Sequence, residues 1–191
     1  MDPAACILTA GMLLLLPLQW VVAAIFAAAV HELFHMLALG ICGVKIHEVR
    51  IGAFGAKIGV GPIQPYKEMI CALAGPVGGF ALLLLGKWMP RVAICGAIHS
   101  LYNLLPLYPM DGGRVLRCVL QLICPSKWDS AFVHLQIILL SIITVLGIYA
   151  CLFLGLGLIP LIFVAVLWRK TKIHLANGGF YGYNSANLQK R

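Results

Sequence analysis

Residues 18 to 39 read LQWVVAAIFAAAVHELFHMLAL, and this stretch decides the class of fold. As a helix, its 22 residues extend about 33 Å, close to the thickness of about 30 Å of a membrane hydrocarbon core. The stretch lies in a longer apolar run, from Ala4 to Ile41, which would extend about 57 Å and is too long for one crossing. Because Pro17 interrupts this run, we expect a short helix over 4–16 and a membrane-spanning helix over 18–39.

The composition supports the same class. Hydrophobic residues make up 62% of the chain and charged residues 10%, and the mean hydropathy is +0.98. These values indicate a membrane protein, for which the lipid bilayer is a partner. The net charge of +8 comes from basic residues that are spread between apolar segments, so we attribute it to membrane topology and exclude nucleic acid as a partner.

Further apolar segments occupy residues 69–86, 91–107, 131–150 and 155–168, with an amphipathic segment over 112–124 that we place at the membrane interface. The sequence therefore predicts an α-helical polytopic membrane protein with about six transmembrane helices. We expect one intramembrane domain over residues 1–176. The segment 177–191 has no apolar periodicity and is expected to be a flexible C-terminal tail.

The distribution of basic residues predicts the orientation. With six crossings, both termini lie on one side, and the basic cluster near the C-terminus indicates that this side is cytoplasmic. The expected cytoplasmic segments then carry twelve basic residues: Lys45, Arg50, Lys57, Lys67, Arg114, Arg117, Lys127, Arg169, Lys170, Lys172, Lys190 and Arg191. The opposite side carries two, Lys87 and Arg91. We expect a multi-pass protein of a bacterial cytoplasmic membrane.

Apolar and polar residues alternate between 44 and 62, which predicts a small membrane-associated β-hairpin. The alternation slips at His47-Glu48, and Gly52 and Gly55 allow a bend, so a bulge is expected. An edge of the hairpin could accept an extended substrate by strand addition, or the hairpin could be a structural cap. Both interpretations stay open at this stage.

The helix predicted over 18–39 contains candidate metal ligands and a candidate catalytic residue in the pattern His31-Glu32-Leu33-Phe34-His35. Residues four positions apart lie on one face of a helix, so His31 and His35 can bind one Zn²⁺. The intervening Glu32 can then act as a general base, an arrangement typical of metalloproteases. A satisfied pair of core histidines and a non-catalytic membrane metal site are the alternatives.

A hydrolytic zinc site with two histidines needs a third protein ligand. Asp111 is the natural candidate, because two prolines and Gly112-Gly113 break the helix there, at a depth where broken backbone is tolerated only inside protein. His99 is the rival third ligand, although an imidazole in a helix bundle more often bonds a neighbouring helix. Asn103, one turn after His99, is a candidate to bond the freed backbone or a substrate strand.

Three separated signatures resemble the site-2 protease family of intramembrane zinc metalloproteases. They are His31-Glu32-Leu33-Phe34-His35, Ala74-Gly75-Pro76, and NLLPLYPMDGG over residues 103–113. Together with the glycine-rich hairpin, they span about residues 21–116. Within the family, the chain is most similar to the sporulation branch, which has six crossings, a Phe-Gly hairpin and an aromatic residue before the second proline, here Tyr108.

The resemblance implies that His31, His35 and Asp111 bind one zinc ion and that Glu32 is the catalytic acid and base. Asn103, Pro106 and Pro109 would shape the substrate site. The implied substrate is a membrane-tethered or membrane-associated protein, with a transcription-factor precursor in sporulation as one candidate, and a membrane inhibitor or regulator is a further candidate partner. An inactive regulatory relative and a membrane metal transporter are the other classes considered.

Overall fold

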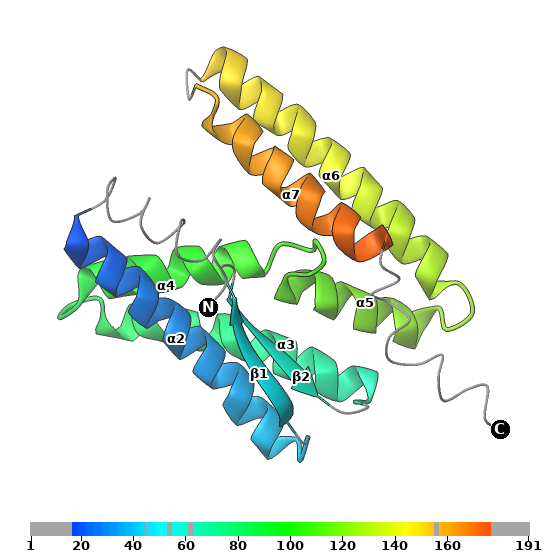
Figure 1. Ribbon diagram of the computed structural model, residues 1–191, viewed down its shortest axis with the longest axis horizontal. Helices are drawn as coiled ribbons and strands as arrows, with labels where there is room; N and C mark the ends of the chain where they lie inside the picture. The colour runs from blue at the N-terminus through cyan, green and yellow to red at the C-terminus, as the bar shows by residue number, and fades with distance from the viewer. Residues whose placement is uncertain (1–16, 45, 53–54, 61–62, 155–156, 177–191) are drawn as a thin grey trace. The chain divides into compact units, whose positions relative to one another are not determined.

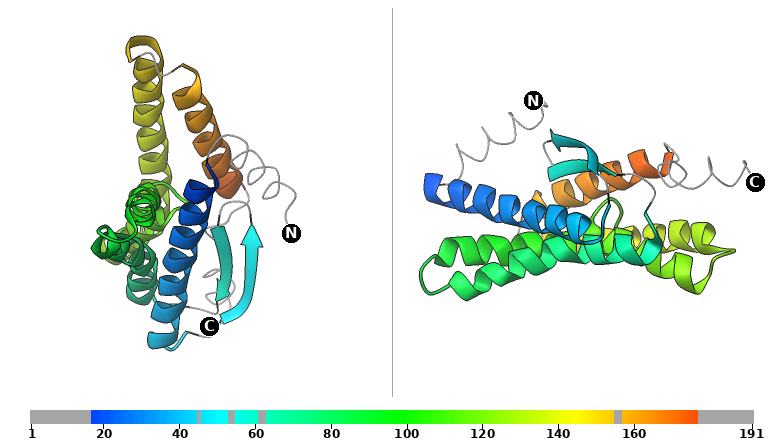
Figure 2. Two further views of the ribbon diagram at one scale, coloured as in Figure 1. Left: turned by 90° about the vertical axis from the view of Figure 1, so that its left-hand side faces the viewer. Right: turned by 90° about the horizontal axis from the view of Figure 1, so that it is seen from below.

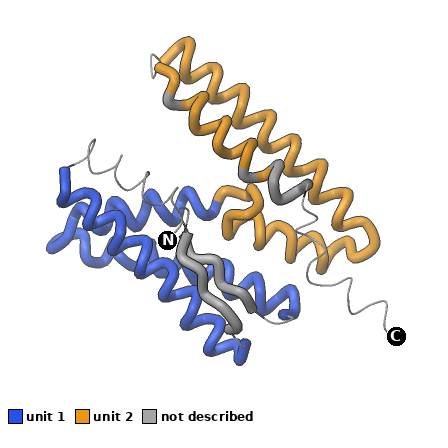
Figure 3. Tube along the Cα trace, viewed as in Figure 1, with its two compact units in different colours: residues 1–104 blue, residues 105–191 orange. Residues whose placement is uncertain are grey.

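The structure is a computed structural model that describes residues 17–44, 46–52, 55–60, 63–154 and 157–176. The chain divides into two compact units, Met1–Leu104 and Leu105–Arg191 (Figure 3). The expected helix over 4–16 and the expected tail over 177–191 lie outside the described residues.

The first unit is built on three helices (Figure 1). These are α2 (Leu18–Ile41), α3 (Pro65–Ala81), which continues into a 3₁₀ turn over Leu82–Leu85, and α4 (Pro90–Asn103). Pro17 lies immediately before α2, and a proline is the first residue of both α3 and α4. Proline suits this place because its fixed φ is helical and its missing N–H would have had no helical acceptor.

Small residues let these helices approach closely. A Cβ on Gly96 of α4 would lie 2.6 Å from the backbone oxygen of Gly79 of α3, so the two helix backbones meet without side chains between them. The core beside this contact consists of Ala23, Ala27, Leu82 and Val92. Close packing of small residues drives helix association where lipid removes the hydrophobic effect. Large apolar side chains are instead exposed, including Ile25, Leu37, Val77 and Ile98.

Two antiparallel strands, β1 (Ile46–Gly52) and β2 (Gly55–Val60), follow α2. Val49 is paired with Ile58 near the middle of the ladder. The register shifts between Ile46 and Glu48, which is where the polar pair His47-Glu48 interrupts the alternation. The two helices on either side of the strands are joined by a hydrogen bond. Lys67, in the first turn of α3, donates from Nζ to the carbonyl oxygen of Cys42, just after α2, 3.0 Å away.

The second unit contains α5 (Asp111–Ile123), α6 (Trp128–Phe153) and α7 (Ile159–Ala176). Helices α6 and α7 run side by side in opposite directions (Figures 1 and 2). A hydrogen bond from the Trp168 indole to the Thr144 hydroxyl, 2.9 Å long, joins them. A Cβ on Gly147 would meet the Val164 side chain at 2.8 Å, so glycine is needed for the close contact between α6 and α7.

The helices follow the predicted segments, with shifted ends. Within the described residues, three helices are long and apolar enough to cross a membrane: Leu18–Ile41, Pro65–Leu85 and Trp128–Phe153. The segment expected over 91–107 is shorter than predicted, because α4 ends at Asn103 and the chain leaves the helix before Pro106. The described helices thus provide three candidate spans, and six crossings stay a prediction.

Candidate metal centre

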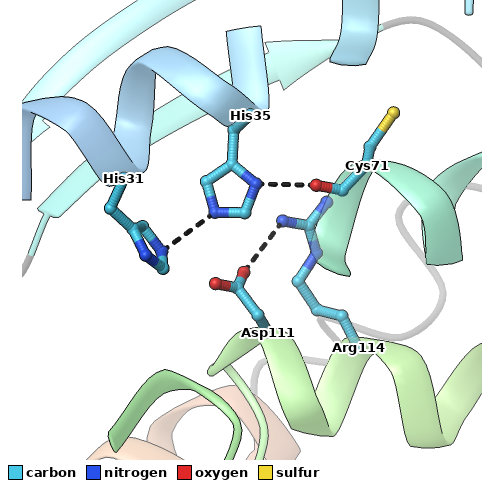
Figure 4. A network of polar contacts seen from close by, with 5 residues as sticks. All are labelled: His31, His35, Cys71, Asp111 and Arg114. Carbon is cyan, nitrogen blue, oxygen red and sulfur yellow. Dashed lines mark hydrogen bonds and ion pairs between the residues drawn. The ribbon is translucent and has the colours of Figure 1, made fainter. Parts of the chain in front are cut away.

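The two histidines of the motif face each other on α2. Their Nε2 atoms are 3.1 Å apart, and the rings meet edge to face with centroids 4.8 Å apart (Figure 4). Both residues are buried, His31 at 2% and His35 at 6% exposure. The four-residue spacing on one helix therefore brings two imidazole nitrogens to one point, as the sequence predicts.

A backbone carbonyl fixes the orientation of His35. Its Nδ1 donates a hydrogen bond to the carbonyl oxygen of Cys71 on α3, 2.7 Å away (Figure 4). Because a carbonyl oxygen only accepts, Nδ1 must carry a proton, so in the neutral tautomer of the ring the Nε2 lone pair is directed at His31. Histidines that bind metals usually have this second partner, which sets both tautomer and ring direction.

The neighbouring glycine leaves the space that a ligand would occupy. A Cβ on Gly75 of α3 would lie 2.5 Å from Cε1 of His35 and 2.6 Å from Nε2 of His31. Gly75 belongs to the Ala74-Gly75-Pro76 signature, and its role here is to keep the two Nε2 atoms uncovered. Two converging ring nitrogens, one with a fixed lone pair, next to a face without a side chain, fit a metal ion such as Zn²⁺.

His99 and Asn103 both lie on α4, and each has a defined contact. The His99 ring packs edge to face on His31, with centroids 4.7 Å apart. Asn103 donates from Nδ2 to the backbone oxygen of His99, 3.0 Å away, within its own helix. The hydrogen bond of Asn103 to His99 thus lies within α4 rather than on the broken backbone, and the predicted contact of Asn103 with a substrate strand stays a prediction.

Glu32 and Phe34 lie between the two histidines in sequence and are both partly buried. The Phe34 ring packs over Gly78 of α3, where a Cβ would lie 2.6 Å from a ring carbon. The bulky aromatic residue inside the motif is thus accommodated by a glycine on the facing helix α3, one turn from Gly75, which faces the histidine rings.

Asp111 lies in the second unit, as the first residue of α5. Its Oδ1 is 3.7 Å from Nη1 of Arg114, one turn later, and the side chain is 9% exposed (Figure 4). A carboxylate is favoured at a helix N-terminus, where backbone N–H groups lack helical partners. The preceding segment carries Pro106 and Pro109, and the bond between Tyr108 and Pro109 is cis.

Gln136 of α6 was not predicted from the sequence as a residue of the site. This residue is fully buried, and its side-chain amide makes two hydrogen bonds to the backbone of the segment before Asp111. The signal was present in the sequence, since Gln136 is a lone amide in the most apolar candidate span. Polar side chains inside membrane helices usually have specific partners.

Comparisons with known proteins agree with this geometry. No protein-family model matches the chain. A zinc metalloprotease of Methanocaldococcus jannaschii is 27% identical over 108 residues, covering 49% of this chain and 32% of that protein. The protein Rip3 of Mycobacterium tuberculosis, provisionally named a zinc metalloprotease, is 31% identical over 109 residues, covering 47% of this chain and 28% of that protein. The chain spans about a third of the length of these curated relatives.

A solved structure matches over most of the chain. It is a site-2 protease from Methanocaldococcus jannaschii, with a TM-score of 0.65 and 19% identity, covering 88% of this chain and 84% of that one. Fold and candidate site thus define a helical protein with apolar, membrane-length helices and a buried pair of histidines four residues apart on one helix. Its fold is that of a site-2 protease, and about half of its sequence is related to zinc metalloproteases.

Proposed function

We propose that this protein is an intramembrane zinc metalloprotease of the site-2 type. One observation carries the proposal: the Nε2 atoms of His31 and His35 converge at 3.1 Å on a buried helix face, with Glu32 between the two residues in sequence. The relation to proteins named zinc metalloproteases and the fold of a site-2 protease support the same activity.

The proposed zinc ligands are His31, His35 and Asp111, three buried residues whose donor types suit this ion. Two neutral imidazoles and one carboxylate leave a tetrahedral ion one open position, the arrangement of catalytic rather than structural zinc sites. When bound, zinc would polarise the scissile carbonyl and make water more acidic.

The remaining chemistry belongs to Glu32. As the general base, its carboxylate would take a proton from the attacking water and then deliver it to the leaving amide nitrogen. Its place in α2 next to His31 is partly buried. Cys71 contributes through its backbone, by holding the ring of His35 in the metal-binding tautomer.

The proposed substrate is a membrane-tethered or membrane-associated protein, presented as an extended chain. A helical peptide bond is shielded by its own hydrogen bonds, so a substrate has to unwind before cleavage. Among the described residues, β1 and β2 form a two-stranded sheet, and an extended segment could add to one of its outer edges as a further strand. Asn103, Pro106 and Pro109 are proposed to shape the path of that segment.

The finer assignment is to the sporulation branch, which includes stage IV sporulation protein FB. It rests on Tyr108 before the second proline and on the Phe54-Gly55 pair in the sequence. A transcription-factor precursor is the corresponding substrate, and a membrane protein is the corresponding regulator. The proposed orientation has both termini in the cytoplasm of a bacterial cell, supported by the bias of basic residues.

The test uses the full chain, purified and reconstituted in lipid vesicles. Zinc content is measured, and a set of single-span membrane segments fused to a fluorescent reporter is scored for peptide-bond cleavage. We expect about one zinc ion per chain, cleavage that stops on chelation, and recovery of cleavage when zinc is returned.

The same vesicles report on the alternative classes. Uptake of zinc into the vesicle interior without cleavage would indicate a transporter, and stable zinc binding without cleavage of any segment would indicate an inactive relative. Either result would overturn the proposed protease activity.

A further inference from the structure

We propose that Gln136 and Thr171 are positioning residues that hold the broken segment before Asp111 in the conformation needed for metal binding. This inference rests on the proposed function, because it assigns Asp111 as a ligand. All of the contacts that carry it lie within the second unit, between residues 106–111 and helices α5, α6 and α7.

The side-chain amide of Gln136 bonds both a donor and an acceptor of the backbone before Asp111, as a neighbouring β-strand would. Its Oε1 accepts a hydrogen bond from the N–H of Tyr108, and its Nε2 donates one to the carbonyl oxygen of Pro106, each 2.9 Å long. The two bonds enclose Leu107, which is 1% exposed. A side-chain amide is suited to this because it offers a donor and an acceptor side by side.

Thr171 of α7 provides a third side-chain hydrogen bond to the backbone of the same segment. Its hydroxyl donates to the carbonyl oxygen of Tyr108, 3.1 Å away, and the residue is 2% exposed. Three backbone groups of the segment are thus bound by side chains: the carbonyl of Pro106 and both the N–H and the carbonyl of Tyr108. These groups need such partners because a broken helix cannot supply them, and a buried group without one costs several kcal/mol in a membrane.

The Tyr108 ring is held as well. It meets Phe132 of α6 edge to face, with centroids 6.3 Å apart, and the Arg117 guanidinium of α5 lies 5.6 Å from its centroid. Gly113 lets α5 pack directly on the segment, since a Cβ there would come 2.6 Å from the backbone oxygen of Leu107. The segment is therefore fixed from all three helices of the second unit.

This fixation bears on Asp111 because the turn leads directly into it. The N–H of Met110 bonds the carbonyl oxygen of Leu107 at 2.9 Å, and the N–H of Arg114 bonds the carbonyl oxygen of Met110 at 3.0 Å. The path of the chain from Pro106 to Asp111 is consequently set by side chains that lie 28 to 63 positions further along the chain than their backbone partners. Partners that orient ligands in this way typically change metal affinity 10- to 100-fold when removed.

The experiment measures metal binding by the full chain in lipid. Zinc affinity is determined by competition with a chelator, and the absorption spectrum of bound Co²⁺ reports the ligand geometry. The variants are Gln136→Leu, which keeps the size but loses both hydrogen bonds, Thr171→Val, and Thr171→Ser, which keeps the hydroxyl. Ser141→Ala is the matched control, because the Ser141 hydroxyl is exposed and bonds only within α6, to Ile137. Asp111→Ala calibrates the loss of the ligand itself.

We expect Gln136→Leu and Thr171→Val to weaken zinc binding by about 10- to 100-fold and to alter the Co²⁺ spectrum toward that of Asp111→Ala. Thr171→Ser should restore most of the affinity, and Ser141→Ala should bind as the unmodified chain does. A purely structural role would lower the thermal unfolding temperature of the metal-free protein while the affinity and the spectrum stay unchanged.

Unchanged zinc affinity and an unchanged Co²⁺ spectrum in folded Gln136→Leu or Thr171→Val would overturn the inference. If Gln136→Leu does not fold, the comparison of Thr171→Val with Thr171→Ser decides alone. If Asp111→Ala also binds zinc normally, the ligand assignment in the proposed function has failed. If only Asp111→Ala loses zinc, the failure is confined to the positioning residues.

Discussion

The two halves of the proposed metal centre are built differently. In the first unit, His31 and His35 converge because they are four residues apart on the regular helix α2. In the second unit, Asp111 follows a segment with two prolines, whose backbone is bound by side chains from α6 and α7. A pair of ligands from one helix needs only its rotamers fixed, whereas a ligand after broken backbone depends on distant residues.

The difference predicts unequal sensitivity to substitution. On α2, one hydrogen bond from His35 to the Cys71 carbonyl and one missing Cβ at Gly75 suffice to prepare the pair. Before Asp111, three side-chain hydrogen bonds and an aromatic contact are used. We expect helix α2 to keep its histidine geometry through most distant substitutions, while substitutions in α6 and α7 act on Asp111.

The largest effect is expected from Glu32→Gln, which tests the helical half. Gln is nearly the same size as Glu and leaves both histidines in place, so the variant should bind zinc as the unmodified chain does. Cleavage should fall by about 10²-fold or more, because a general base has been removed. Zinc analysis and the vesicle cleavage assay are the measurements.

Undiminished cleavage by the Gln variant would show that the carboxylate between the histidines has no catalytic role. Loss of zinc together with activity would instead show that Glu32 supports the metal site itself, and a Glu32→Asp variant would then separate the two effects.

The next effect is the loss of zinc on Asp111→Ala, which tests the other half. His99→Ala is the matched control, since His99 packs on His31 at a centroid distance of 4.7 Å and was the rival ligand. We expect the Asp111 variant to lose most bound zinc and the His99 variant to keep it. Zinc stoichiometry of each purified variant decides, and the opposite pattern would identify His99 as the third ligand.

A smaller, purely steric effect is expected from Gly75→Ala. The added Cβ would lie 2.6 Å from Nε2 of His31, so the ring or the helix has to shift and zinc affinity should fall by at least 10-fold. Gly40→Ala on α2 is the control, since no atom lies within 4 Å of its added Cβ. That variant should bind zinc normally and be more stable by about 0.5–1 kcal/mol.

Chelator competition gives the affinities and thermal unfolding gives the stabilities. Equal zinc affinities for the two alanine variants would mean that the face beside the histidines is not where the metal binds, contrary to the fit of Gly75 to that site.

The smallest effect on zinc binding is expected from Ile58→Pro, which should lower only the cleavage of substrate. Residue 58 is paired with Val49 in the strand pair, and proline removes a backbone N–H and restricts the strand. We expect a folded, zinc-loaded variant with sharply reduced cleavage of membrane-anchored segments, while Ile58→Val behaves normally. Normal cleavage by the proline variant, or crosslinks from the strands that never reach substrate, would leave the strand pair as a structural cap.

The sequence alone determined most helices and strands, and the pair of histidines in the candidate site. Apolar length predicted the three candidate spans found among the described residues, alternation predicted the strands, and the slip at His47-Glu48 predicted where the register shifts. It also predicted that His31 and His35 share a face, because a four-residue spacing has one geometric meaning on a helix. These features are local, so residues near in sequence are enough to define them.

Only the tertiary structure decided which groups orient the candidate ligands. That the Cys71 carbonyl sets the His35 tautomer, and that Gly75 leaves the ring nitrogens uncovered, depends on how α3 packs on α2. The sequence offered Asn103 as a candidate partner of the broken backbone or of a substrate strand, but the backbone is bound by Gln136 and Thr171, 28 to 63 residues away from their partners. Hydrogen bonds across such separations follow from helix packing, which no local pattern of residues encodes.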